Sequence, residues 1–257
     1  MKRIIAVVNQ KGGVGKTTTC VNVAATLVET GDKVLLIDLD PQGNATTGSG
    51  VKKDQIMWHT GDVLLGKIDF AKAILKHTTA GYDLLPANIS LSGAEIDLIK
   101  LENPSFQLQK TVKDYVNRYD YIIIDCPPSL TILTTNGLIG AHCILIPVQC
   151  EFFALEGLVS LLDTIKQIKL KHNPTLNIVG VLRTMFDARV GLTKHVSKQL
   201  EDFFGDKLLK TVIPRNIRLA EAPSFGLPAL KYDRLSKGAL SYLAVTKELK
   251  GKLISIN

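Results

Sequence analysis

The chain alternates between short, continuously apolar runs and longer stretches in which apolar residues recur at helical spacing. The apolar runs are rich in Val and Ile and cover residues 3–8, 33–37, 121–124, 143–148 and 176–182. Continuous apolarity, unlike strict alternation, indicates strands that are covered on both faces, as in a parallel sheet with flanking helices. Residues 17–30 predict a helix that ends at Gly31, and residues 155–171 predict a second, amphipathic helix.

This order of elements predicts an α/β fold, doubly wound, with a mostly parallel sheet and helices on both faces. The 257 residues show no repeat, low-complexity tract or Pro/Gly/Ser-rich linker, so we expect a single domain over residues 1–257. With 46% hydrophobic and 21% charged residues, the composition is that of a globular protein and excludes disordered, collagen-like and coiled-coil chains.

Several absences favour a place in the cytoplasm. No apolar stretch approaches the length of a membrane span, and the N-terminal apolar run is too short for a signal peptide. The cysteines lie singly in apolar surroundings and without metal-ligand spacing, which favours buried, reduced thiols. They are Cys20, Cys126, Cys143 and Cys150.

The strongest chemical signal is the glycine-rich segment KGGVGKTT between the first predicted strand and the first predicted helix. In such a turn successive backbone N–H groups point into one concavity, and the N-terminal end of the helix adds to the attraction for phosphate. We expect Lys16 to reach the β- and γ-phosphates and the Thr17 hydroxyl to hold Mg²⁺. Gln10 stands where the strict phosphate-loop pattern has its first glycine. The residues expected to contact a nucleotide here are Lys11, Gly12, Gly13, Val14, Gly15, Lys16, Thr17 and Thr18.

Three acidic residues follow predicted strands and fit the same site. Asp38 and Asp40 follow the second strand, and Asp125 follows the strand that ends at residue 124. Open parallel sheets bind ligands beyond the carboxyl ends of their strands, where all three acids would lie. We expect Asp125 and Asp38 to hold Mg²⁺ and Asp40 to position water, but the sequence leaves the division of roles between Asp38 and Asp40 open. An acid at a strand end also often only caps the next turn. No glutamate follows Asp125 to act as a strong base, so hydrolysis should be slow.

The formal charge of +7 lies entirely in the last fifth of the chain. Residues 207–257 contain ten bases and three acids, whereas residues 1–206 contain 21 of each. This distribution makes an anionic partner for the C-terminal end the first hypothesis. A solvated basic face is the ordinary alternative, and Lys247 and Lys250 stand just before Gly251, where cations complement a helix C-terminus. Aromatic residues are sparse there, which favours a duplex backbone over stacking on single-stranded bases.

Together these segments resemble the ParA/Soj family of partitioning ATPases, a deviant Walker A, MinD-like branch of the P-loop NTPases. The resemblance runs nearly end to end, through NQKGGVGKTTT, LLIDLDPQGNATTG, YDYIIIDCPPS, IPVQCEFFALEGL, TMFDAR and VIPRNIRLAEAPSFGLP. It implies an ATPase with ATP and Mg²⁺ as cofactors, weak intrinsic hydrolysis and an ATP-dependent sandwich homodimer. It further implies binding of non-specific double-stranded DNA, stimulation by a ParB-like partner and a place on the nucleoid.

The resemblance also implies roles for particular residues. Lys11 matches the signature lysine that crosses to the partner's nucleotide, and Gly12 matches the small residue that permits this approach. Lys11, Lys16 and Asp40 are the expected catalytic residues. The segment against the adenine corresponds to Pro214, Arg215 and Asn216. The surface for DNA corresponds to Arg189, Arg218 and Lys231.

Two other functions stay open beside chromosome or plasmid partitioning. A MinD-like positioning ATPase would end in an amphipathic membrane helix, but the tail KELKGKLISIN contains Gly251 and lacks aromatic anchors, so we expect no membrane binding. A metabolic ATP-dependent enzyme of the same fold remains possible on the phosphate site alone, because a fold does not fix a function.

Overall fold

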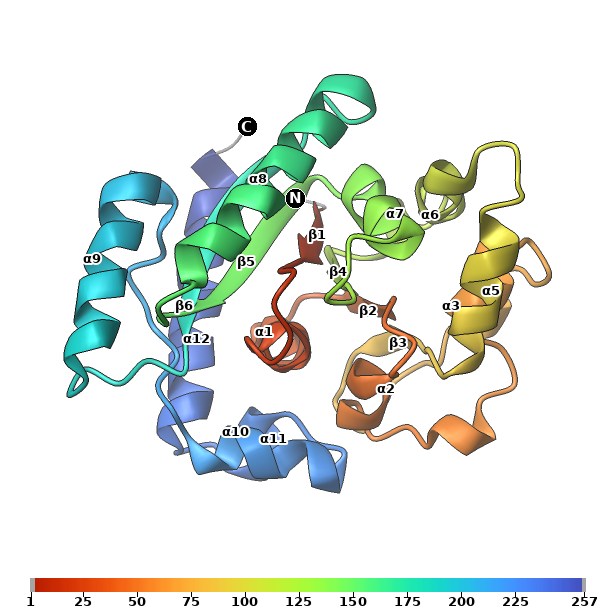
Figure 1. Cartoon of the computed structure of the whole chain (residues 1–257). Helices are drawn as coiled ribbons and strands as arrows, with labels where there is room; N and C mark the ends of the chain where they lie inside the picture. Colours follow the sequence, from red (N-terminus) through yellow and green to blue (C-terminus); the bar gives the residue numbers. More distant parts are fainter. Residues whose placement is uncertain (1–2, 256–257) are drawn as a thin grey trace.

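The sheet positions the residues of the predicted phosphate and metal site. A computed structural model describes residues 3–255, and within them six strands form one parallel sheet in the order β3-β2-β4-β1-β5-β6 (Figure 1). Every neighbouring pair runs in the same direction, so all the carboxyl ends lie at one edge. The strands are β1 (Arg3–Val7), β2 (Val34–Asp38), β3 (Asp83–Leu85), β4 (Tyr121–Asp125), β5 (Cys143–Gln149) and β6 (Asn177–Thr184).

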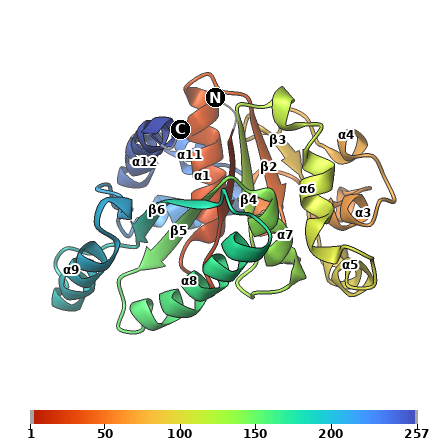
Figure 2. The same cartoon turned by 90° about the horizontal axis from the view of Figure 1, so that it is seen from above.

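Helices cover both faces of this sheet, as the continuous apolar runs predict. α7 (Ile132–Gly140) and α8 (Ala154–Lys171) lie on one face, and α1 (Lys16–Glu29) and α12 (Lys237–Ser255) lie on the other (Figure 2). Alternate residues of β1 enter different cores: Ile4 belongs to the cluster with α7 and α8, and Ile5 to the cluster with α1 and α12. The predicted doubly wound α/β fold is therefore confirmed.

α9 and several short helices complete the two layers and connect the strands. The α-helices are α2 (Asn44–Gly48), α3 (Thr60–Leu64), α4 (Phe70–Ala73), α5 (Ser90–Leu98), α6 (Gln107–Val112), α9 (Gly191–Phe204), α10 (Ile217–Glu221) and α11 (Ala229–Tyr232). The 3₁₀ turns are η1 (Lys53–Gln55), η2 (Pro104–Phe106), η3 (Val116–Arg118), η4 (Gly205–Lys207) and η5 (Ala222–Phe225). Across residues 3–255, no helix has the length and apolarity that crossing a membrane would require.

The predicted end of the last helix is wrong. α12 continues through Gly251 to Ser255, because Leu253 is buried against the sheet and its burial outweighs the roughly 1 kcal/mol that a mid-helix glycine costs. Lys247 and Lys250 therefore lie inside the helix and do not complement its C-terminus. The four cysteines are free and buried, as predicted.

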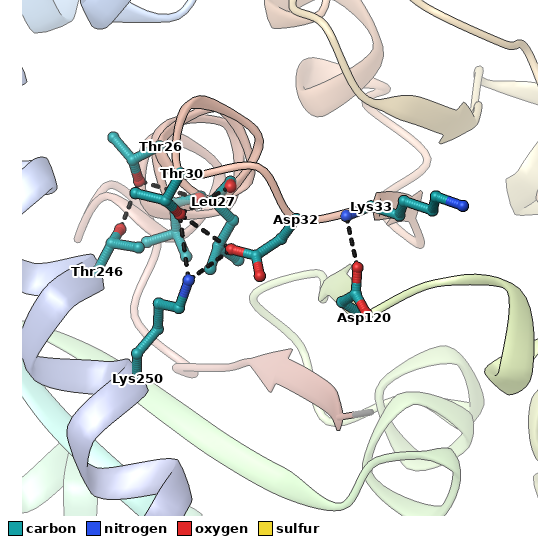
Figure 3. A network of polar contacts seen from close by, with 9 residues as sticks. Thr26, Leu27, Thr30, Asp32, Lys33, Asp120, Thr246 and Lys250 are labelled. Carbon is teal, nitrogen blue, oxygen red and sulfur yellow. Dashed lines mark hydrogen bonds and ion pairs between the residues drawn. The ribbon is translucent and has the colours of Figure 1, made fainter. Parts of the chain in front are cut away.

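A line of polar contacts fastens α1 to the C-terminal segment, and we call it the α1–α12 seam. Its α1 residues recur at helical spacing, so they share one face of the helix. The Thr26 hydroxyl bonds the Thr246 hydroxyl, and the Lys250 ammonium reaches Asp32 Oδ2 at 2.7 Å just beyond the helix (Figure 3). The seam comprises the pairs Thr19–Tyr242, Asn22–Ala229, Thr26–Thr246, Glu29–Arg234, Thr30–Lys250 and Asp32–Lys250.

Candidate functional site

The glycine-rich loop turns from the carboxyl end of β1 into the N-terminus of α1. Gly13 and Gly15 have φ values of 74° and 85°, a left-handed conformation that glycine adopts without steric cost. Asn9 holds the start of the loop: its Oδ1 accepts from the Lys11 N–H at 2.9 Å, and its Nδ2 donates to the Pro147 carbonyl at 2.7 Å. The loop thus has the backbone form that a phosphate cradle needs.

Lys16 is buried at the first position of α1, with 7% of its surface exposed. Its Nζ donates to the Lys11 carbonyl at 3.0 Å across the loop. Burial lowers the pKa of Lys16, and the charges of Asp125 and Asp40 act in the opposite direction. A buried ammonium that bonds only a neutral carbonyl would gain from an anionic phosphate in the same place.

Asp38 is already engaged in holding the loop that follows β2. Its Oδ2 accepts from the Thr46 N–H at 2.8 Å and from the Thr46 hydroxyl at 2.7 Å, and its Oδ1 accepts from the Asp40 N–H at 3.1 Å. Burial raises the pKa of Asp38 to about 6, and the bonds from Thr46 counteract part of that rise. Both Asp38 oxygens thus serve the local structure, and its predicted place at the metal stays a prediction.

Asp125 lies directly beside Asp38 in the sheet register and is fully buried. Its Oδ2 has no hydrogen-bond partner among residues 3–255. Burial first, and then the charge of Asp38, raise its pKa to about 8, while the Thr17 hydroxyl and the Cys20 thiol lower it. An orphaned carboxylate oxygen beside further acids and the Thr17 hydroxyl offers the hard oxygen ligands that Mg²⁺ prefers.

These residues fit a magnesium ion that is shared with a nucleotide. The described part of the chain brings no three His, Cys, Asp or Glu side chains together as an all-protein metal site. Mg²⁺ commonly binds through one or two protein oxygens, phosphate oxygens and waters, so such a cluster is not required. Asp40, 8% exposed, lies two residues beyond Asp38 and accepts the Gln42 N–H at 2.9 Å, which fixes its carboxylate at the same edge.

A cavity of about 420 Å³ opens beside the loop and brings the predicted adenine segment to it. Pro214, Arg215 and Asn216 line this cavity together with Gly15 and Thr18. The two segments are about 200 residues apart in the sequence, and β6 brings them together: the Ile213 N–H bonds the carbonyl of Arg183, in β6, at 2.9 Å. The structure therefore places the predicted adenine segment against the predicted phosphate loop.

Sequence reasoning missed several further residues of this cavity, among them Thr184, Met185 and Tyr242. The Thr184 hydroxyl donates to the Val14 carbonyl at 2.8 Å and so fixes the loop from the end of β6. Met185 has a φ of 48°, a strained conformation of the kind that collects at ligand sites. The acids were found because residues that follow parallel strands lie at the ligand-binding edge of the sheet. The same argument, applied to the predicted strand at residues 176–182, would have indicated Thr184 and Met185.

Lys11 points away from its own phosphate loop. Its ammonium forms an ion pair with Glu151, just beyond β5, and both side chains are just over 40% exposed. Gly12 beside it has open space where a Cβ would be. Among residues 3–255, therefore, no neighbour explains the small residue.

The three cations expected to contact DNA are exposed, and each already has a partner within the chain. Arg189 makes two bonds to the Asp187 carboxylate, of 2.9 and 2.7 Å. Arg218 contacts Glu221 at 2.8 Å and Asp233 at 3.2 Å, and Lys231 donates to the Thr79 carbonyl at 2.8 Å. Exposed pairs of this kind exchange readily with other anions, so the predicted role stays a prediction.

Other exposed cations of the C-terminal segment make no ion pair or side-chain hydrogen bond with any residue from 3 to 255. Lys250 is not among them, because its ammonium belongs to the α1–α12 seam. The unpaired cations are Lys207, Lys210, Arg215, Lys237 and Lys247.

Comparison with known proteins finds relatives that cover nearly the whole chain. An AAA domain family model matches residues 2–178. The sporulation initiation inhibitor protein Soj of Bacillus subtilis is 48% identical over 97% of this chain and 98% of its own, and the chromosome partitioning protein ParA of Caulobacter vibrioides is 45% identical over 96% and 93%. Among solved structures, cobyrinic acid a,c-diamide synthase of Mycobacterium smegmatis with bound ADP and magnesium aligns with a TM-score of 0.87, at 37% identity over 99% of this chain and 96% of that one.

Proposed function

Because the chain belongs to the ParA/Soj family of ATPases, we propose that it is a partitioning switch in which ATP controls binding to DNA. The observation that carries this proposal is the convergence at one sheet edge of the glycine loop, the buried Lys16 and the unsatisfied Asp125 oxygen. A C-terminal segment with several unpaired cations supplies the second half of the switch.

ATP and Mg²⁺ would occupy the loop and the adjoining cavity. The backbone of residues 12–18 and the Lys16 ammonium hold the phosphates, and Pro214, Arg215 and Asn216 hold the adenine. Thr17 and Asp125 provide oxygen ligands for Mg²⁺, directly or through water, and Asp38 lies beside them. Bound there, Mg²⁺ would neutralise charge on the phosphates.

The arrangement around Lys11 supports an ATP-dependent dimer. Phosphates that already bind Lys16 and Mg²⁺ do not need the Lys11 ammonium as a further cation. Lys11 would instead neutralise charge on the nucleotide of a partner chain. Lys11 is exposed, and Gly12 leaves room for close approach. ATP shifts the monomer–dimer equilibrium only by its greater affinity for the dimer.

Slow hydrolysis would return the dimer to monomers. The Gln42 N–H fixes the Asp40 carboxylate, which would position the water. No glutamate follows Asp125 to act as a strong base, so turnover would depend on a stimulating ParB-like partner. The dimer's C-terminal cations would contact duplex phosphates with little dependence on sequence and strong dependence on salt. This activity would place the protein on the nucleoid.

The test is duplex-DNA binding measured without nucleotide, with ADP and with a non-hydrolysable ATP analogue. We expect tight binding only with the analogue, and we expect the Lys16→Gln variant to lose both nucleotide and DNA binding. Asp40→Ala should keep ATP, dimerise and stay on DNA, because it lacks only the residue that positions water.

Other results would select other functions. DNA binding that is equal in all three nucleotide states, or absent in all, would contradict the switch and favour a metabolic enzyme. Binding to anionic vesicles with the ATP analogue, without DNA binding, would favour a MinD-like positioning ATPase. Normal turnover of Asp40→Ala would remove Asp40 from its proposed role.

A further inference from the structure

Cys20 lies in the second turn of α1, on the side that faces β4, and its side chain is fully buried. Its sulfur is 3.4 Å from Asp125 Oδ1 and 4.0 Å from the Ile124 carbonyl. Both acceptors belong to the end of β4. A thiol has a single hydrogen to donate, and the carboxylate oxygen is both nearer and more basic than the carbonyl.

The two oxygens of Asp125 are therefore in different situations. Oδ1 accepts from the Cys20 thiol, whereas Oδ2 has no hydrogen-bond partner among residues 3–255. The torsion that rotates an aspartate carboxylate has broad energy wells, so the side chain by itself does not fix where either oxygen points. A bond to one oxygen fixes the position of the other.

We propose that Cys20 is a positioning residue for Asp125: its thiol binds Oδ1 and leaves Oδ2 as the oxygen available to Mg²⁺ or to one of its waters. This inference rests on the proposed function, because it requires Asp125 to serve the metal. Groups that orient a metal-binding carboxylate commonly change metal affinity when they are removed.

Cys143 provides the comparison that separates this role from ordinary packing. It is a buried thiol in the same hydrophobic cluster as Cys20, on β5, and its sulfur makes no hydrogen bond within the described residues. Truncating either cysteine to alanine removes a similar volume from the same core. Only truncation of Cys20 removes a donor from Asp125.

The experiment titrates Mg²⁺ into the full-length protein with a fluorescent ATP analogue, and repeats nucleotide binding in EDTA. For Cys20→Ala we expect about five- to tenfold weaker Mg²⁺ affinity, with binding in EDTA unchanged, since a thiol is a weak donor. Cys20→Ser keeps a donor and should restore most of the affinity, whereas Cys143→Ala should behave like the unmodified protein. Infrared spectra of the nucleotide-free protein should show the S–H band lost in Cys20→Ser at lower frequency than the band lost in Cys143→Ala.

Equal Mg²⁺ affinities for Cys20→Ala and Cys143→Ala, with Asp125→Asn clearly weaker, would overturn the positioning role and leave the metal role of Asp125 intact. Cys20→Ser as weak as Cys20→Ala would likewise assign the effect to volume and overturn the inference. Unchanged Mg²⁺ affinity in Asp125→Asn would overturn the proposed metal site itself, and the inference with it.

Discussion

At the scale of single residues, the ion pair between Lys11 and Glu151 competes with the proposed role of Lys11. To reach a partner's nucleotide, the lysine must leave Glu151. Exposed pairs of this kind contribute about 0.2–1 kcal/mol, so the competition is small but measurable. We expect Glu151→Gln to promote dimerisation with a non-hydrolysable ATP analogue. Because both protomers of the homodimer must break this pair, the protein concentration at half-dimerisation should fall by up to about 30-fold.

Analytical ultracentrifugation over a concentration series would measure this shift. Glu156→Gln is the matched control, because Glu156 is an exposed acid in the first turn of α8 that makes no ion pair within the described residues. Weaker dimerisation of Glu151→Gln would show instead that Glu151 holds Lys11 in its working position.

Residues whose chemistry is local could be predicted from the sequence, and residues brought in by packing could not. Lys16 and the three acids come soon after the ends of predicted strands. Because the carboxyl ends of parallel strands lie at one edge of the sheet, the sequence predicts that these residues meet there. Tyr242 reaches the cavity only because α12 packs against α1, and Glu151 meets Lys11 across 140 residues. No pattern within either segment specifies these meetings.

At the scale of elements, Glu248 ties α12 to the segment that follows η4. Its carboxylate accepts the N–H groups of Lys210 at 2.7 Å and Thr211 at 3.0 Å. Burial acts to raise the pKa of Glu248, but these backbone bonds outweigh it and hold the pKa below its ordinary value. A depressed pKa stabilises the fold above the unfolded-state value near 4.5, and this stability is lost as the pH falls through the folded-state value.

We therefore expect the free energy of unfolding to fall less steeply between pH 5 and pH 3 in Glu248→Gln than in the unmodified protein. Urea denaturation at a series of pH values measures this slope. Glu201→Gln serves as a control on α9, since Glu201 is exposed and pairs only with Lys198 within the described residues. Identical slopes for all three proteins would show that Glu248 has no net linkage to folding.

Most strands and two of the long helices were predicted from the sequence, whereas α9, which is as long as α1, was not. Five strands and the helices α1 and α8 follow from apolar runs and helical spacing, with ends within a few residues of those observed. β3 was missed because a three-residue strand is too short to form a pattern. Gly251 misled the prediction of α12, because tertiary packing overrides local propensity.

At the scale of the whole molecule, the C-terminal charge is divided between structural and free cations. The predicted DNA-binding residue Arg218 and the seam residue Arg234 are both exposed and both ion-paired. Substituting either removes one charge, together with two ion pairs at Arg218 and one at Arg234. We expect Arg218→Gln to weaken binding to all duplex sequences and to reduce the slope of log affinity against log salt by about 0.9 for each phosphate that the variant no longer neutralises. Arg234→Gln should change neither.

Fluorescence anisotropy with two unrelated duplexes at several salt concentrations would measure this, with the ATP analogue present. Affinity for the analogue should be the same in both variants, since neither residue lines the cavity. Weaker binding to only one of the duplexes would contradict non-specific recognition, and equal weakening in the two variants would assign the effect to net charge alone.

The central place of β1 in the sheet determines when, during synthesis on the ribosome, the molecule can be finished. β1 emerges first but pairs with β4 and β5, and the cavity beside its loop needs Pro214 and Tyr242. At 5–20 residues per second, the chain between Lys16 and Tyr242 takes roughly 10–45 s to appear. β1 and its loop therefore wait for segments that are synthesised much later, and ATP can stabilise only a chain that has been synthesised past Tyr242.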